Sequence, residues 1–115
     1  FKDETGIKNN ITNVPLPAGT NGLLFKKSYE DIIIPNLKKF SPDIIFISAG
    51  FDGHKDDPLA DFQLIEEDFF WITKKLVIFA SKYCKNRLVS TLEGGYNIKA
   101  LSKSSLAHVK GLILW

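Results

Sequence analysis

An acidic segment, SAGFDGHKDDPLAD at residues 48–61, has the residue types of a cation site. It carries four aspartates and one histidine between Asp52 and Asp61. Carboxylate oxygens bind divalent cations such as zinc. Gly50 and Gly53 flank Asp52 and allow the sharp turn that would point its carboxylate away from a preceding strand. The alternative is a solvated loop that binds no metal.

Asp52 and His54, two residues apart, suggest a second arrangement in which both side chains bind one cation. A single Asp-x-His pair is a weak signal, because a catalytic zinc takes three protein ligands. The other histidine, His108, falls inside an expected helix. The sequence therefore supplies at most part of a zinc site.

The segment LEGGYN, residues 92–97, places two glycines directly before a tyrosine. Gly94 and Gly95 leave room for a group close to the backbone, and they put Tyr96 in a turn rather than in a core. A phenol beside a metal donates a hydrogen bond to a carbonyl oxygen that gains charge during hydrolysis. A glycine-rich turn whose tyrosine merely packs is the alternative. Neither common phosphate-loop pattern occurs in the chain.

Apolar patterns predict the elements that carry these segments. Residues 43–48 form a short apolar run, typical of a parallel strand covered on both faces, and residues 87–92 predict a second strand. Helices are expected at 66–83 and 98–114. The apolar side of the first is Phe69, Ile72, Leu76, Phe79 and Tyr83, and that of the second is Leu101, Leu106, Val109, Leu112 and Ile113. This order predicts a three-layer αβα fold with a parallel sheet, in the α/β class.

The first forty residues contain a connection and then a helix. Residues 1–22 have loop composition, with an expected short strand at Ile11–Val14. Residues 23–40 are predicted to be helical, and Pro35 should kink or divide that helix. Its expected apolar positions are Leu24, Tyr29, Ile32, Ile33 and Leu37.

This topology places Asp52 and Tyr96 at one edge of the sheet. Each follows the carboxyl end of a predicted strand, and ligands of open α/β sheets bind off these ends. We therefore expect the two side chains to share one site.

Composition limits the remaining classes. A net charge of +2 gives no support to direct nucleic-acid binding, and no apolar run has the roughly 18 residues of a membrane span. The single cysteine, Cys84, forms no internal disulfide and is expected to be a buried or half-buried structural thiol. The chain begins at Phe1 and contains no methionine, so a piece of a longer protein is expected.

Two long stretches resemble a known family. SPDIIFISAGFDGHKDDPLADFQL, followed by LVSTLEGGYN, is similar to the C-terminal part of the zinc-dependent histone deacetylase and acetylpolyamine amidohydrolase family. NVPLPAGTNG resembles the segment that precedes it, so the match runs from Asn13 to the end. SAGFD, DPLA and LEGGY are closer to the class II branch than to class I. The resemblance implies an arginase–deacetylase type of fold, with residues 1–115 as the C-terminal part of one catalytic domain.

The resemblance also implies residue roles. Asp52, in SAGFD, corresponds to a zinc-binding aspartate, and Tyr96, in EGGY, to the tyrosine that polarises the acetyl carbonyl. Gly94 and Gly95 correspond to glycines that line the substrate channel, and Leu59, in DPL, to a position at its mouth. Protein deacetylases of this branch are apolar at that position, whereas the polyamine-selective branch is acidic. The position of His54 is not a zinc ligand in the family.

The family's other zinc ligands and its tandem catalytic histidines have no counterpart in residues 1–51. The resemblance therefore predicts a zinc-dependent enzyme only for the intact protein, acting on acetylated lysine side chains of histones or other proteins. It implies co-repressor proteins as further partners and a nuclear or cytoplasmic location. This piece alone is expected to be inactive and, because its apolar sheet lacks neighbours, to self-associate. The alternatives are an acetylpolyamine or other small-molecule amidohydrolase, and a non-catalytic α/β module that binds partners.

Overall fold

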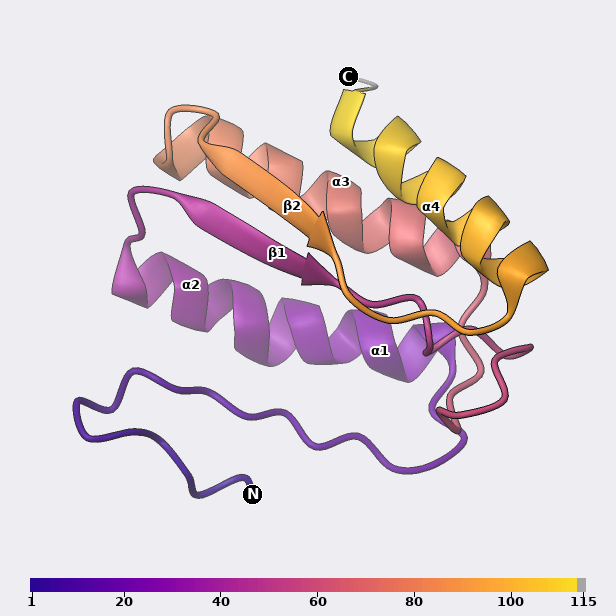
Figure 1. Ribbon diagram of the computed structural model, residues 1–115. Helices are drawn as coiled ribbons and strands as arrows, with labels where there is room; N and C mark the ends of the chain where they lie inside the picture. Colours follow the sequence, from indigo (N-terminus) through magenta and orange to yellow (C-terminus); the bar gives the residue numbers. More distant parts are fainter. Residues whose placement is uncertain (114–115) are drawn as a thin grey trace.

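The computed structural model describes residues 1–113, so Leu114 of the predicted last helix lies outside the described residues. The elements, in chain order, are α1 (Gly22–Ser28), a π-helical turn η1 (Tyr29–Ile33), α2 (Ile34–Phe40), β1 (Ile45–Ala49), α3 (Glu66–Tyr83), β2 (Leu88–Leu92) and α4 (Ile98–Ile113) (Figure 1). This confirms the predicted order of helices and strands. No helix among residues 1–113 has the length and apolar character needed to cross a membrane.

The two strands are parallel neighbours, as their connection through a helix predicts. Ile45 pairs with Leu88, and the register continues to Ala49 and Leu92. α3 forms the connection between them, so both strands end at the same edge of the sheet.

All the helices that contact this sheet lie on one of its faces. Ile45 packs with Phe79 of α3, and Leu37 of α2 packs against the same cluster. On the opposite face, Phe46 is 72% exposed and Val89 is 47% exposed. The prediction of a strand covered on both faces is therefore wrong for residues 1–113, because these residues provide a helical layer for one face only.

α3 begins and ends as its sequence dictates. The Asp68 carboxylate accepts a hydrogen bond from the Ile65 N–H at 3.0 Å, and the first turn is acidic, which suits the positive end of the helix dipole. After Tyr83 the chain adopts positive φ at Lys85 and Asn86, which ends the helix. The buried side of α3 includes Phe69, Ile72, Leu76 and Phe79, as predicted, whereas Tyr83 is 47% exposed.

α4 buries a different side from the one predicted. Leu106, Val109 and Ile113 are exposed. The residues that it buries are mostly small: Ala100, Ser104, His108 and Gly111. Small residues let α4 approach α3 closely, since a methyl group on Gly111 would lie 2.8 Å from the Cβ of Thr73. Close packing on α3, rather than apolar content, therefore decides the orientation of α4.

The helix predicted at 23–40 forms, but a π-helical turn interrupts it. The turn η1 is followed directly by α2, and the backbone stays helical across the junction. Pro35 lies in the first turn of α2, and because it has no N–H, one helical hydrogen bond to the preceding turn is missing beside the π turn. The interruption shifts the side chains that face the core. Leu24 and Ile32 are exposed, and Phe25 and Ile34 pack against the core in their place.

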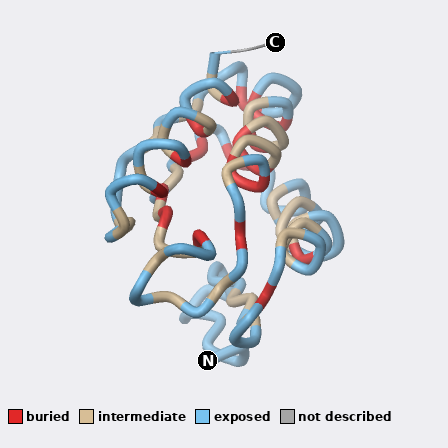
Figure 2. Tube along the Cα trace, turned by 90° about the vertical axis from the view of Figure 1, so that its right-hand side faces the viewer, coloured by how far each residue is buried: buried red, intermediate tan, exposed pale blue. Residues whose placement is uncertain are grey.

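The N-terminal segment runs beside α1 and α2 without joining the sheet (Figure 1). The strand predicted at Ile11–Val14 is absent, and residues 1–12 are exposed, as the pale blue tube near the N-terminus shows (Figure 2). Pro15 and Pro17 interrupt the backbone donors there, which disfavours strand pairing. Cys84, by contrast, is buried as predicted, and its Sγ donates to the Pro42 carbonyl oxygen at 3.2 Å.

Candidate functional site

The loops that follow β1 and β2 continue side by side beyond the sheet. The Phe51 N–H donates to the Gly94 carbonyl oxygen at 2.8 Å, and the Glu93 N–H donates to that of Ala49 at 3.0 Å. A methyl group on Gly94 would lie 3.1 Å from Oδ1 of Asp52. The structure therefore brings Asp52 next to the glycine-rich turn.

The Asp52 carboxylate is half-buried and has no hydrogen-bond or ion-pair partner among residues 1–113. It lies against two glycines, since a methyl group on Gly50 would be 3.0 Å from its Oδ1. An unpartnered carboxylate held in such a cradle fits the role of one oxygen ligand to a cation. No group of three or more histidine, cysteine, aspartate or glutamate side chains could hold a metal within the described part of the chain. A zinc ion held by Asp52 would need its other ligands from outside these residues.

Tyr96 lies at the end of the glycine-rich turn and is 57% exposed. Gly95 has φ +138, and a methyl group there would lie 2.8 Å from Cδ1 of Leu101. Both the backbone angle and the close approach require glycine at this position. The turn thus presents the phenol of Tyr96 beyond the sheet edge, rather than in the core.

Leu59 lies in the loop after β1 and is 70% exposed. Its N–H donates to Oδ1 of Asp57 at 2.8 Å, which closes a tight Asp-Pro turn. An exposed apolar side chain in this loop is compatible with a position at the mouth of a channel.

His54 is buried, with only 2% of its surface exposed. Its Nδ1 accepts the Asp56 N–H at 3.1 Å, so in the neutral ring the proton is on Nε2, which lies 3.3 Å from Oε2 of Glu66. His54 is therefore held within the acidic loop through Nδ1, and it lies against the start of α3, where Nε2 has no hydrogen bond among the described residues. Its contacts do not include Asp52. The Glu66 pKa is lowered by its own backbone N–H and then by His54 and Lys103, against partial desolvation.

Sequence reasoning missed the role of Asp57. Its Oδ2 accepts the Tyr96 N–H at 2.9 Å, so one side chain of the acidic loop contacts the glycine-rich turn directly. The local signal was the Asp57-Pro58 dipeptide, which is typical of a turn closed by an aspartate side chain.

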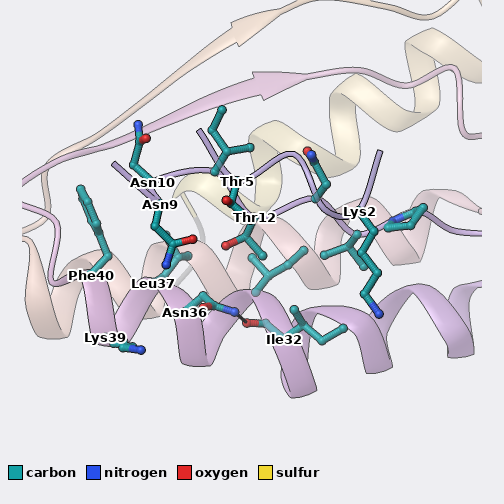
Figure 3. A pocket seen from close by; sticks show the side chains of 15 residues that line it. Lys2, Thr5, Asn9, Asn10, Thr12, Ile32, Asn36, Leu37, Lys39 and Phe40 are labelled. Atoms are coloured by element: carbon teal, nitrogen blue, oxygen red, sulfur yellow. Dashed lines mark hydrogen bonds between the residues drawn. The ribbon is translucent and has the colours of Figure 1, made fainter. Parts of the chain in front are cut away.

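A hollow of about 810 Å³ lies away from this edge, between the N-terminal segment and the helix formed by η1 and α2 (Figure 3). Amide and apolar side chains such as Asn9, Asn36, Leu37 and Phe40 line it, and its titratable side chains are the lysines Lys2 and Lys39. It contains no carboxylate, histidine or phenol, so its size does not make it the site of the chemistry.

Comparisons with known proteins decide the family. A family model described as the histone deacetylase domain matches residues 1–112. The chain belongs to the histone deacetylase domain family. Its resemblance to the class II branch agrees with a relative in Dictyostelium discoideum, the type-2 histone deacetylase 2, which is 47% identical over 107 residues.

Other members of the family show the same similarity over most of this chain. Histone deacetylase 14, chloroplastic, of Arabidopsis thaliana is 39% identical over 101 residues, 88% of this chain. The crystal structure of the HDA15 HD domain superposes with a TM-score of 0.87 at 30% identity and covers 98% of this chain. The chain spans only part of each: 6% of the Dictyostelium relative, 24% of the Arabidopsis relative and 32% of the HDA15 chain. The match to the deacetylase fold confirms the predicted α/β class.

Proposed function

We propose that this chain is the C-terminal part of a single catalytic domain that, when intact, is a zinc-dependent lysine deacetylase. Asp52 would be one zinc ligand, and the other ligands would come from outside residues 1–113. When bound, zinc supplies Lewis-acid polarisation of the substrate carbonyl and a water nucleophile near neutral pH. The observation that best supports this proposal is the unpartnered Asp52 carboxylate beside the turn that carries Tyr96.

Tyr96 would donate its phenolic hydrogen bond to the acetyl oxygen as that oxygen gains negative charge. A donor placed in advance for a developing charge is worth more than one that must reorient during the reaction. The exposed turn leaves the phenol accessible to a substrate that arrives from outside the sheet edge.

Leu59 supports acetyl-lysine side chains of proteins as the substrate class. Its exposed apolar side chain would contact the aliphatic part of a lysine, whereas a cationic polyamine would favour a carboxylate at that position. Histones and other acetylated proteins are the substrates that the family implies. Co-repressor partners stay a prediction from the resemblance.

The test compares zinc content and deacetylation in the intact protein and its Asp52→Asn variant. We expect the wild type to contain zinc and to hydrolyse an acetyl-lysine peptide faster than an N-acetylated polyamine. Asp52→Asn should lose both the metal and the activity. Asp61→Asn, an equal charge change at an exposed residue of the same loop, should retain both.

Two results would contradict the proposal. One is a wild-type protein that turns over the peptide without zinc, and the other is an Asp52→Asn variant with wild-type zinc content and rate. Preference for the polyamine would keep the zinc chemistry and overturn the substrate class.

A further inference from the structure

The carboxylate of Asp57 joins the two loops that carry the proposed site. Its Oδ1 accepts hydrogen bonds from the N–H groups of Leu59 at 2.8 Å and Ala60 at 3.3 Å. Its Oδ2 accepts the N–H of Tyr96, 39 residues further along the chain, at 2.9 Å. One side chain thus holds the backbone of the loop after β1 and that of the turn after β2.

The backbone on either side of Tyr96 is held by other contacts, including the hydrogen bond from the Phe51 N–H to the Gly94 carbonyl oxygen. On the carboxyl side, Asn97 precedes α4, and its Oδ1 accepts the Ala100 N–H at 2.9 Å. On the amino side are Gly94 and Gly95, which have more backbone freedom than other residues. The bond to Asp57 lies between these two regions and restrains the residue whose phenol would act on the substrate.

The carboxylate is well suited to this bridging contact. Partial desolvation acts to raise its pKa, but hydrogen bonds from the backbone N–H groups of Leu59, Tyr96, Ala60 and Asn97 outweigh it and keep the Asp57 pKa below its usual value. Asp57 is therefore ionised near neutral pH. Hydrogen bonds to an ionised acceptor are shorter and stronger than those between neutral groups.

We propose that Asp57 is a positioning residue that sets the placement of Tyr96 and Leu59 together. It does not touch the substrate, and it couples the mouth of the site to the phenol through two backbone N–H groups. This inference rests on the proposed deacetylase function for its effect on rate. Its effect on backbone order does not depend on that function.

The experiment uses Asp57→Asn in the intact protein, with Asp61→Asn as the matched control. Asparagine keeps the shape of the side chain but replaces one acceptor oxygen with an NH₂ group, which cannot accept the Tyr96 or Leu59 N–H. We expect kcat on an acetyl-lysine peptide to fall about 10- to 100-fold, as misplacement of a catalytic group by about 1 Å does. KM should change far less, and Asp61→Asn should stay within about twofold of wild type.

A double variant separates positioning from general damage. If Asp57 acts through Tyr96, Asp57→Asn combined with Tyr96→Phe should be no slower than Tyr96→Phe alone, because the phenol is already missing. If the double variant instead showed the product of the two single-variant losses in kcat, the proposal would be overturned. Asp57→Glu, which keeps the charge but shifts the carboxylate by one methylene, should fall between wild type and Asp57→Asn; it decides the case if Asp57→Asn does not fold.

Amide hydrogen exchange provides a measurement that needs no activity. Asp57→Asn should speed exchange in the peptide that contains Tyr96, and Asp61→Asn should not. Unchanged exchange at Tyr96 would overturn the proposal even in an active enzyme. A wild type without deacetylase activity would instead count against the proposed function, and hydrogen exchange would still decide the role of Asp57.

Discussion

Nε2 of His108 on α4 lies 2.8 Å from Oγ of Ser90 on β2. The other ring nitrogen, Nδ1, is 2.7 Å from Oγ1 of Thr73 on α3. The Thr73 hydroxyl donates to the Phe69 carbonyl oxygen, so it must accept from Nδ1–H, and Ser90 then donates to Nε2. A buried neutral imidazole thus connects two helices and a strand, and its ring makes an edge contact with Phe51, the residue before Asp52.

This connection predicts a pH-dependent stability. Burial lowers the pKa of His108 below 6.5, so the unfolded chain binds a proton that the folded chain does not. The contribution of His108 to the free energy of unfolding should therefore be at its maximum above about pH 6.5. It should decrease as the pH is lowered below that value. Asp57 and Glu66 have lowered pKa values and remain ionised between pH 7.5 and 5.5, so they add nothing in this range.

The measurement is urea unfolding of the intact protein and its His108→Gln variant from pH 7.5 to 5.5. The neutral glutamine has no titration in this range, and its stability should change less with pH than that of the wild type. If the free energy of unfolding changed equally with pH in the two proteins, His108 would not be the source of the pH dependence.

A methyl group at position 111 should destabilise the contact between α3 and α4. In Gly111→Ala, the new Cβ would lie 2.8 Å from Cβ of Thr73 and 3.2 Å from the Phe70 carbonyl oxygen. Overpacking of this kind costs about 1–3 kcal/mol and outweighs the gain of up to about 1 kcal/mol in helix propensity. Thermal unfolding should show a lower Tm, whereas Ser102→Ala, on the exposed side of α4, should be neutral or slightly stabilising. A more stable Gly111→Ala variant would mean that the two helices can separate at little cost.

If Tyr96 has the proposed role, Tyr96→Phe should lower kcat about 10²- to 10³-fold, because it would remove one hydrogen-bond donor to the developing oxyanion. Tyr83→Phe is the control: it removes a hydroxyl from an exposed tyrosine whose ring packs at a tilted angle against Phe79 of the same helix. Its rate should equal that of the wild type. Steady-state kinetics on an acetyl-lysine peptide provide the comparison, and a Tyr96→Phe rate within a few-fold of wild type would refute the role of the phenol.

Under the proposed function, Gly94→Ala should weaken zinc binding without replacing Asp52, the proposed ligand. The added methyl group would lie 3.1 Å from Oδ1 and 3.2 Å from Cγ of Asp52, so the carboxylate must shift. Changes next to a metal ligand typically cost about 10- to 100-fold in affinity. Gly53→Ala gives an equally close contact, 3.1 Å, but with Cδ1 of Leu64 rather than with the Asp52 carboxylate, and should weaken zinc binding much less. Zinc titration against a competing chelator compares the two; equal affinities would show that the Asp52 cradle tolerates a side chain.

Some of this structure could be predicted from local sequence. The bounds of α3 follow from an acidic first turn, an apolar stripe and a break near Asn86, and all three signals lie within the helix or next to it. Two strands joined through a helix are normally parallel, so their carboxyl ends lie at the same edge of the sheet. This rule places Asp52 and Tyr96 at one edge, and it needs only the order of strands and helices.

Other features depend on partners distant in the sequence. The exposed apolar side of α4, including Leu106, has the right period for a buried face, yet the side with His108 and Gly111 fits against Thr73. Phe46 is a large apolar residue in an apolar strand, which predicts burial, but no element among residues 1–113 covers it. The bond from Asp57 to Tyr96 joins residues whose proximity appears only after two strands have paired.

The π-helical turn η1 controls the rotational phase of the two helices that it joins. Phe25 of α1 and Leu37 of α2 both pack toward the sheet. They are twelve residues apart, and at about 100° per residue an uninterrupted α-helix would point them about 120° apart. Counting the π turn as one inserted residue leaves eleven steps and reduces the difference to about 20°. Deleting one residue from Tyr29–Ile33 would restore regular helical pitch and leave Phe25 and Leu37 facing the core, whereas a regular α-helix that kept all twelve steps would turn one of them away.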